Sequence, residues 1–280
     1  MTGGTSSEHL DAPGQHAWAP TALTIAGADS SGAAGLAADL RAFAAAGVHG
    51  TFALTLVSAQ NTVEFREAQP VDAELVTAQI HAVLDDMPVA ASKTGLLLTA
   101  ETVAAVASVA ARRLPQLVVD PVLVNGAGEP MLSAEAERAV ATRLLPGARV
   151  VTPNHLEAGR LVGRDLGDEV EAWIEAAREL AATGPDAVVV TGGRLRTGTT
   201  ITDVVVRGGA VRLLSAPRIE TRNVRGSGDV FSAAICAELA KGTEIDAAID
   251  AARELTTRAI SAGATRRLGS GQGPVDPLTG

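Results

Sequence analysis

A glycine-rich turn followed by an acidic residue is the stretch of this chain whose residue types best suit chemistry. Gly226-Ser227-Gly228-Asp229 precedes an apolar run with helical spacing. The first N–H groups of a helix have no partner inside it, so this turn would offer several N–H dipoles to an anion. Asp229 stands at the same helix start, where a carboxylate could accept a proton from an attacking hydroxyl. Alternatively, Asp229 is only a helix cap that offsets the helix dipole.

Two common phosphate-binding motifs are missing from the sequence. There is no Gly-x-x-x-x-Gly-Lys-Ser/Thr, and no Gly-x-Gly-x-x-Gly follows the first expected strand. The turn at 226–229 is therefore the surviving candidate for binding a phosphoryl group. Its N–H groups would stabilise the group in transfer, and Asp229 would act as the base.

Short β-like runs alternate with amphipathic helices along most of the chain, which predicts a mostly parallel sheet covered by helices on both faces. We expect strands at 22–26, 51–57, 89–92, 116–119, 148–151 and 187–190. We expect helices at 35–46, 72–85, 100–113, 133–145, 168–182, 229–241 and 245–262, with another carrying Glu157. Two β-rich runs at 200–206 and 210–216 flank Gly208-Gly209 and predict a hairpin. Polar residues follow several strands, where α/β sheets bind ligands.

Composition narrows the classes of function. The chain has 280 residues, of which 46% are hydrophobic and 20% charged, and a formal net charge of -9. This charge excludes a nucleic-acid binder, because phosphate-backbone affinity rests on clustered Lys and Arg. No apolar stretch is long enough to cross a bilayer. A lone cysteine, Cys236, cannot form an intrachain disulfide, so we expect a cytoplasmic protein.

The domain organisation is expected to be simple. Residues 1–20 are rich in Gly, Ser and Thr and predict a flexible N-terminal extension. No linker or internal repeat interrupts the remainder, so residues 21–280 are expected to form a single domain.

A series of segments in order resembles the hydroxymethylpyrimidine and phosphomethylpyrimidine kinases of thiamine biosynthesis, which belong to the ribokinase-like superfamily. The segments that carry the resemblance, besides the turn at 226–229, are Thr24-Ile25-Ala26-Gly27-Ala28-Asp29-Ser30-Ser31-Gly32-Ala33-Ala34-Gly35, Ala38-Asp39-Leu40, Ser58-Ala59-Gln60-Asn61-Thr62, Lys93-Thr94-Gly95-Leu96-Leu97, Val119-Asp120-Pro121-Val122, Thr152-Pro153-Asn154-His155-Leu156-Glu157-Ala158, Ala216-Pro217-Arg218-Ile219 and Gly271-Gln272-Gly273-Pro274-Val275. They extend over nearly everything from Leu23 to Val275.

This resemblance implies a three-layer α/β/α ribokinase-like fold, with the hairpin added to a mostly parallel central sheet. It implies transfer of the γ-phosphate of ATP to the hydroxymethyl group of 4-amino-5-hydroxymethyl-2-methylpyrimidine, to its monophosphate, or to both. ATP and Mg²⁺ would be the cofactors, and the partner would be a small hydroxymethyl heteroaromatic molecule. A homodimer is one option, but the sequence does not fix the oligomeric state.

The acceptor side is carried over position by position. The resemblance places Gln60 at the aminopyrimidine edge, where an amide can donate and accept together. It places Gly27, Asp29, Ala34 and Leu96 around the same pocket. Outside the resemblance, Gln60 could instead satisfy a loop at a strand end, and Asp29 could shape the glycine-rich turn.

The phosphate side is carried over in the same way. The resemblance implies Asp229 as base, with Gly226, Ser227 and Gly228 forming the anion hole. Asp120 and Glu157 would serve Mg²⁺, plausibly through water, and the nucleotide-binding residues would be Asn154, Glu157, Thr191 and Gly193. The residues alone leave alternatives open. Asp120 could be a turn residue and Asn154 a helix N-cap, while Lys93 could be a solvated surface cation and Asp39 a structural residue.

Two departures from the family pattern widen the choice of acceptor. Many pyrimidine kinases have cysteine at the position of Asp229, whereas sugar and nucleoside kinases have aspartate there. Thr191 replaces a common lysine, which removes a cation beside the nucleotide. A pyridoxal or pyridoxine kinase, or a sugar or nucleoside-type kinase of the same superfamily, is therefore the alternative activity. A non-catalytic ligand-binding homologue is the alternative of another class.

Overall fold

The computed structural model describes residues 19–126, 128–195 and 198–279. The strands are β1 (Thr21–Asp29), β2 (His49–Gln60), β3 (Phe65–Pro70), β4 (Val89–Thr94), β5 (Val118–Val119), β6 (Val150–Val151), β7 (Ala187–Val190), β8 (Thr200–Arg207) and β9 (Ala210–Pro217). The helices are α1 (Leu36–Ala45), α2 (Ala73–Asp86), α3 (Ala100–Arg113), α4 (Ala134–Ala139), η1 (Val140–Leu144), η2 (Leu145–Gly147), α5 (His155–Val162), α6 (Val170–Ala181), α7 (Ser227–Ala240) and α8 (Ile245–Gly263). Residues 1–18 of the expected N-terminal extension (residues 1–20) lie outside the described residues.

Among these residues, one nine-stranded sheet runs in the order β3-β2-β1-β4-β5-β6-β7-β8-β9. The six strands from β2 to β7 in this order (β2, β1, β4, β5, β6 and β7) all pair in parallel with their neighbours. The β2–β3, β7–β8 and β8–β9 pairings are antiparallel. The prediction of a mostly parallel sheet with an added hairpin is confirmed, and both glycines of the hairpin turn have positive φ, as that tight turn requires.

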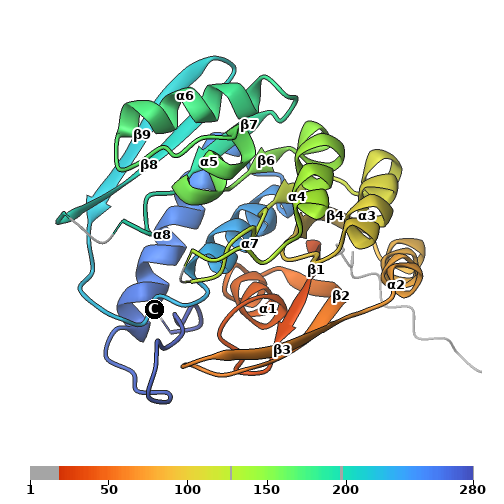
Figure 1. Cartoon of the computed structure of the whole chain (residues 1–280). Coiled ribbons are helices and arrows are strands. Elements are labelled where there is room, and N and C mark those ends of the chain that lie inside the picture. The colour runs from red at the N-terminus through yellow and green to blue at the C-terminus, as the bar shows by residue number, and fades with distance from the viewer. Residues whose placement is uncertain (1–18, 127, 196–197, 280) are drawn as a thin grey trace, which may run out of the picture.

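Helices cover both faces of the sheet because its central strands bury both of their sides. In β5, Val118 packs with α1, α7 and α8, while Val119 faces the core formed with α2, α3, α4 and α6. Val150 and Val151 of β6 divide in the same way. Figure 1 shows α1, α7 and α8 grouped together and α2, α3 and α4 gathered elsewhere on the sheet. The molecule is therefore a three-layer α/β/α structure.

Three local expectations need correction. β1 continues through Gly27 to Asp29, so the turn begins later than expected, because Ala28 and Asp29 still pair with β2. The predicted helix at 133–145 is regular only over α4 and then changes to π-helical and 3₁₀ turns. Strand β3 was not predicted. It is an exposed edge strand that pairs, within the described part of the chain, only with β2, so its sequence lacks a buried alternating face.

The order of the strands determines where a ligand can bind. The chain passes from β1 to β2 on one side and later places β4 on the other side of β1. Connections then leave β1 in opposite directions, which makes the carboxyl ends of β1 and β4 a switch point of the topology, where sheets of this kind bind ligands. α7 packs against β1, β4 and β5, so its N-terminus is brought to this edge.

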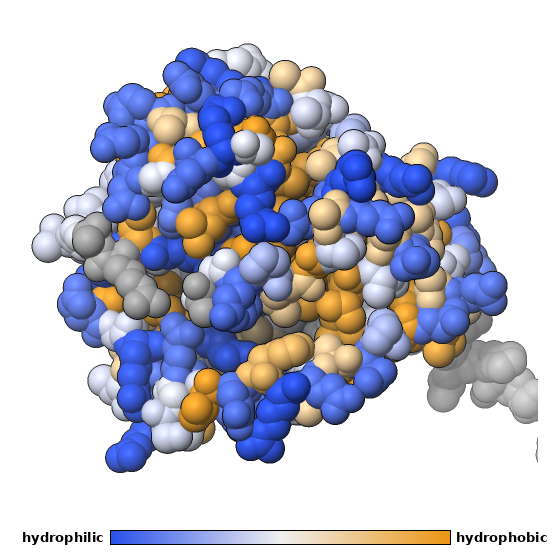
Figure 2. Space-filling view, in the orientation of Figure 1, coloured by the Kyte–Doolittle hydropathy of each residue, from blue (hydrophilic) through white to orange (hydrophobic). Residues whose placement is uncertain are grey.

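The described part of the chain contains no helix long and apolar enough to span a bilayer. Figure 2 shows apolar side chains at the surface in several places, interspersed with polar ones. Near the edge strand β3, the large apolar side chains Phe52, Val57, Val63 and Phe65 are exposed.

Candidate active site

The start of α7 has the unpartnered N–H groups that the sequence predicts. Gly226 is the N-cap and makes no side-chain cap, and Asp229 in the first turn caps nothing. Within the described residues the N–H groups of Gly226, Gly228 and Asp229 donate no hydrogen bond, whereas Ser227 N–H donates to Val224 O at 3.2 Å. The free N–H groups at this helix start are therefore those of Gly226, Gly228 and Asp229, while that of Ser227 is used within the turn. Asp229 makes no capping hydrogen bond, so only the dipole-offsetting part of the helix-cap alternative is left beside the role of a base.

Only glycine fits at residue 226. Its φ is +80°, and an added Cβ would lie 2.1 Å from the carbonyl oxygen of Ala33. Left-handed backbone favours glycine, and no side chain can overlap a carbonyl. The start of α7 therefore packs closely against the turn that follows β1.

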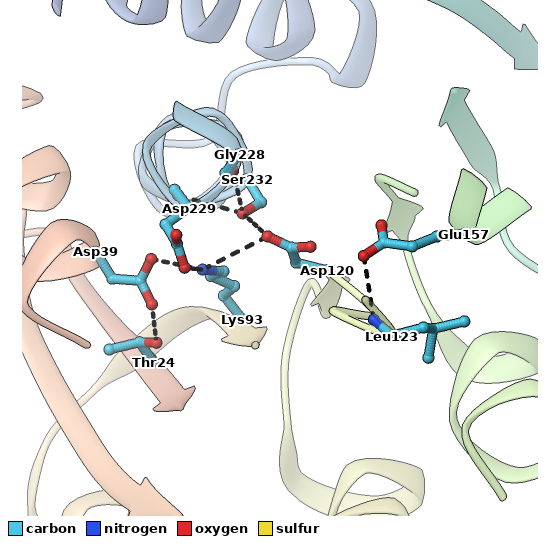
Figure 3. Close-up of polar contacts among 9 residues, drawn as sticks. All are labelled: Thr24, Asp39, Lys93, Asp120, Leu123, Glu157, Gly228, Asp229 and Ser232. Atoms are coloured by element: carbon cyan, nitrogen blue, oxygen red, sulfur yellow. Dashed lines mark hydrogen bonds and ion pairs between the residues drawn. The ribbon is translucent and has the colours of Figure 1, made fainter. Parts of the chain in front are cut away.

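A fully buried lysine joins three carboxylates beneath the start of α7 (Figure 3). Lys93 Nζ, from β4, lies 2.5 Å from Asp39 Oδ1 and 3.8 Å from Asp229 Oδ1. A third carboxylate oxygen, Asp120 Oδ2, is 4.0 Å away. Thr24 donates a hydrogen bond of 2.6 Å to the other oxygen of Asp39. The side chain of Lys93 has 0% exposure, so the alternative of a solvated surface cation is wrong.

One lysine does not neutralise three carboxylates, and the pKa values reflect this imbalance. Burial raises the pKa of Asp39 to about 7, against the opposing effect of Lys93. Burial likewise raises the pKa of Asp120 to about 7, and Asp229 and Glu157 add to the effect. Burial lowers the pKa of Lys93, but Asp39, Asp229 and Asp120 outweigh it and raise that pKa overall. The cluster thus has an excess of negative charge that a cation would relieve.

Asp120 is a buried carboxylate at the carboxyl end of the central strand β5. It follows β5, its side chain is 11% exposed, and its Oδ2 accepts a hydrogen bond of 2.9 Å from Ser232. No group of three or more His, Cys, Asp or Glu side chains among the described residues could hold a metal directly. Mg²⁺ usually keeps several waters and uses one or two carboxylates, so Asp120 fits a magnesium ion that arrives with a nucleotide.

Asn154 and Glu157 form a capping box at the start of α5. Asn154 Oδ1 accepts from Glu157 N at 3.1 Å, and Glu157 Oε2 accepts from Asn154 N at 3.0 Å. Glu157 Oε1 also accepts from Leu123 N at 3.1 Å (Figure 3). The N-cap alternative for Asn154 is confirmed. Each oxygen of Glu157 thus accepts a backbone hydrogen bond, which fixes the orientation of this carboxylate.

Thr191 and Gly193 lie beside this capping box. Thr191 forms a β-bridge with Asn154 beyond the ends of β6 and β7. Gly193 is exposed, and nothing lies within 4 Å of the place a Cβ would take. The predicted nucleotide-side residues are therefore neighbours along one edge of the sheet.

The predicted acceptor-side residues surround the ends of β1, β2 and β4. Gly27 is packed so closely on Leu56 that an added Cβ would be 2.6 Å from its Cγ. Ser30 Oγ donates to Gln60 O at 2.6 Å and accepts from Gln60 N at 2.8 Å, which ties the end of β2 to the turn after β1. Leu96 O accepts a hydrogen bond from Thr55 at 2.7 Å.

The predicted acceptor-side residues differ in whether their side chains already have partners. The side-chain amide of Gln60 makes no hydrogen bond within the described residues and is partly exposed. Ala34 is also partly exposed. Asp29 Oδ1 accepts from Ser31 N at 2.8 Å, so its turn-shaping alternative is confirmed. Asp29 Oδ2 in addition faces Arg225 Nε at 3.4 Å.

The sequence analysis assigned no role to Arg225 or Ser232. It left Asp39 as a structural residue and Lys93 as a solvated surface cation. A signal was present for Lys93, because a cation at the end of a strand buried on both faces needs an anionic partner. No pattern in the sequence indicated that the partner lies in α1.

Comparisons with known proteins agree with this geometry. The family model described as phosphomethylpyrimidine kinase matches residues 29–276. The chain belongs to the phosphomethylpyrimidine kinase family. It is a kinase, a phosphotransferase whose acceptor is an alcohol or a phosphate, and the sequence-based prediction of this class is confirmed.

Individual relatives carry two kinds of name. A hydroxymethylpyrimidine/phosphomethylpyrimidine kinase from Rhizobium meliloti (strain 1021) is 44% identical over 91% of this chain and 95% of the relative. A pyridoxine kinase from Bacillus subtilis (strain 168) is 40% identical over 85% of this chain and 89% of the relative. The crystal structure of an ADP complex of Bacillus subtilis pyridoxal kinase is 39% identical, with a TM-score of 0.85 over 91% of this chain and 96% of that one. The ribokinase-like fold is confirmed.

Proposed function

We propose that this kinase transfers the γ-phosphate of ATP to the hydroxymethyl group of 4-amino-5-hydroxymethyl-2-methylpyrimidine and to the resulting monophosphate, in thiamine biosynthesis. The observation that carries the proposal is the carboxylate of Asp229, which makes no capping hydrogen bond and lies beside three free N–H groups at the start of α7. An alcohol acceptor needs a base, and a transferring phosphoryl group needs such donors.

Each part of the site has a role in this reaction. Asp229 accepts the proton of the acceptor hydroxyl, and the N–H groups of Gly226, Gly228 and Asp229 stabilise the phosphoryl group in transfer. Asn154, Thr191 and Gly193 position the nucleotide, with Glu157 supporting Asn154 through the capping box. Mg²⁺ bound with ATP would neutralise phosphate charge, and Asp120 would hold it through water. The intact base argues against a non-catalytic homologue.

The free side-chain amide of Gln60 supports an aminopyrimidine acceptor. It lies at the end of β2, held through its backbone by Ser30, with both amide atoms available. An amide can donate to a ring nitrogen and accept from an amino group at one edge of the ring. A pyridoxine-type acceptor, suggested by the relative from Bacillus subtilis, is the alternative to be tested beside it.

An acceptor panel tests the proposed activity. ADP release is measured with ATP, Mg²⁺ and each of hydroxymethylpyrimidine, its monophosphate, pyridoxal, pyridoxine, a nucleoside and a sugar. We expect the highest kcat/KM with the pyrimidines. Turnover of pyridoxal or pyridoxine alone would replace the pyrimidine activity with the alternative.

Replacing Gln60 with leucine should raise KM for hydroxymethylpyrimidine by about tenfold, because one hydrogen-bonded pair at a ring edge is lost. KM for ATP should stay the same, since Gln60 lies on the acceptor side. Gln69→Leu on the exposed strand β3 is a matched control. Steady-state kinetics with each substrate varied measures both constants, and an unaltered pyrimidine KM would remove Gln60 from the acceptor site.

The remaining expectations are also proposals. A cytoplasmic location is supported by the use of ATP, and cell fractionation tests it. A homodimer is supported by the exposed apolar side chains near β3, and sedimentation tests it. The continuous sheet over β1 to β9 supports one domain for residues 21–280, for which a single cooperative unfolding transition is expected.

A further inference from the structure

The two proposed acceptors differ in the help they need from the protein. The hydroxyl of the alcohol must lose its proton as it attacks, so this step needs a base. The phosphate of the monophosphate has a second pKa of about 6, so at neutral pH it is mostly a dianion with no proton to lose. It brings extra negative charge towards the phosphates of ATP, so this step needs a cation instead.

Arg225 is placed where such a cation would be useful. It directly precedes Gly226, the N-cap of α7, and its Nε lies 3.4 Å from Asp29 Oδ2 at the end of β1. Its side chain therefore lies between the acceptor-side strand and the anion hole. An acceptor phosphate approaching the γ-phosphate of ATP from that side would pass this guanidinium.

The two terminal nitrogens of Arg225 are available donors. Its side chain is 23% exposed and its buried Nε faces Asp29, whereas neither terminal nitrogen makes a hydrogen bond within the described residues. Arg194, by contrast, uses both terminal nitrogens on the carbonyl oxygens of Asn125 and Val124. A guanidinium with free donors matches the paired oxygens of a phosphate.

The backbone of Arg225 is held on both sides. Its N–H donates to Gly273 O at 3.2 Å, and its carbonyl accepts from Val275 N at 3.1 Å. Asp29 is held in turn by hydrogen bonds from Ser31 N and Oγ, at 2.8 and 2.7 Å. The backbone of Arg225 and the side chain of Asp29 are therefore both held in place, so less ordering remains when a ligand binds.

We propose that Arg225 binds the phosphate of the monophosphate acceptor, so that the second phosphorylation depends on Arg225 whereas the first depends on the base Asp229. This inference rests on the proposed function and deepens it. In the second step a non-bridging oxygen of the acceptor phosphate attacks the γ-phosphorus of ATP. A P–O–P anhydride bond forms, the bond from the γ-phosphorus to the β–γ bridging oxygen breaks, and ADP leaves with that oxygen.

The test compares Arg225→Gln with wild type on both acceptors. We expect kcat/KM for the monophosphate to fall by about tenfold or more, as loss of a charged hydrogen bond does, while kcat/KM for the alcohol changes less than about threefold. Calorimetric binding of the monophosphate without ATP should weaken by a similar factor. Arg225→Lys keeps the charge and should recover part of the loss.

Arg222→Gln is the matched control, because Arg222 is exposed and makes no hydrogen bond or ion pair with the described residues. It should leave both acceptors unchanged. An equal loss on both acceptors in Arg225→Gln would indicate a structural role and overturn the inference, as would no loss on either. A wild-type enzyme that accepts the alcohol but neither binds nor phosphorylates the monophosphate would also overturn it, while the proposed alcohol kinase would stand. A wild-type enzyme inactive on both pyrimidines would overturn the proposed function itself.

Discussion

Asp229→Asn should lower kcat for the alcohol acceptor by roughly 10²-fold or more, which is the usual effect of losing a general base. The substitution keeps the shape of the side chain and removes its ability to accept the hydroxyl proton. ATP binding should change little, because the N–H groups at the start of α7 are backbone groups. Single-turnover kinetics and nucleotide binding measured on the same preparation separate the two effects.

The same variant should affect the monophosphate much less, because a phosphate dianion has no proton to give up. The ratio of the two activities is thus a sensitive measure of the role of Asp229. An unchanged alcohol rate would show that Asp229 is not the base. An equal loss on both acceptors would show that it acts through binding or charge in both steps.

Lys93→Met should destabilise the fold by about 3–5 kcal/mol, the usual cost of removing one partner from a buried ion pair. Lys93 Nζ lies 2.5 Å from Asp39, and the side chains of both have 0% exposure. Without the lysine, Asp39, Asp120 and Asp229 have no cation among them. Chemical denaturation of the variant and wild type measures the difference.

A second substitution distinguishes lost charge from lost packing. Asn at residue 39 can still accept the hydrogen bond from Thr24, so Lys93→Met with Asp39→Asn removes both charges and should recover part of the stability. Lys241→Met is the control, because Lys241 pairs with Glu238 at a side-chain exposure of 33% and such pairs contribute at most about 1 kcal/mol. If the double variant is no more stable than Lys93→Met, the loss comes from packing.

The pH dependence of stability provides a further check on this pair of variants. Burial raises the pKa of Asp39 and Asp120 from the ordinary value of 3.8 to about 7. Between these values the folded protein binds more protons than the unfolded chain, so stability should fall as pH rises towards about 7. In Lys93→Met the fall should be larger and extend to higher pH, since an opposing positive charge is gone.

Apart from β3, the order of helices and strands followed from the sequence alone, as did several local motifs. Hydrophobic periodicity located the regular helices, such as α3, and the hairpin glycines located β8 and β9. The turn at 226–229 indicated phosphoryl transfer because N–H groups at a helix start are unsatisfied whatever the fold. The capping box of Asn154 and Glu157 is equally local, since it spans one helical turn.

Only the tertiary structure decided which charges meet. Lys93 and Asp39 are 54 residues apart in the chain, and each alone is compatible with a surface position. The parallel sheet brings β4 beside β1 and places α1 and α7 over them, so that Asp39, Lys93 and Asp229 meet in a buried cluster. The same packing sets Arg225 against Asp29. Caps and turns depend on neighbours along the chain, which a sequence displays, whereas electrostatic partners depend on how the layers pack.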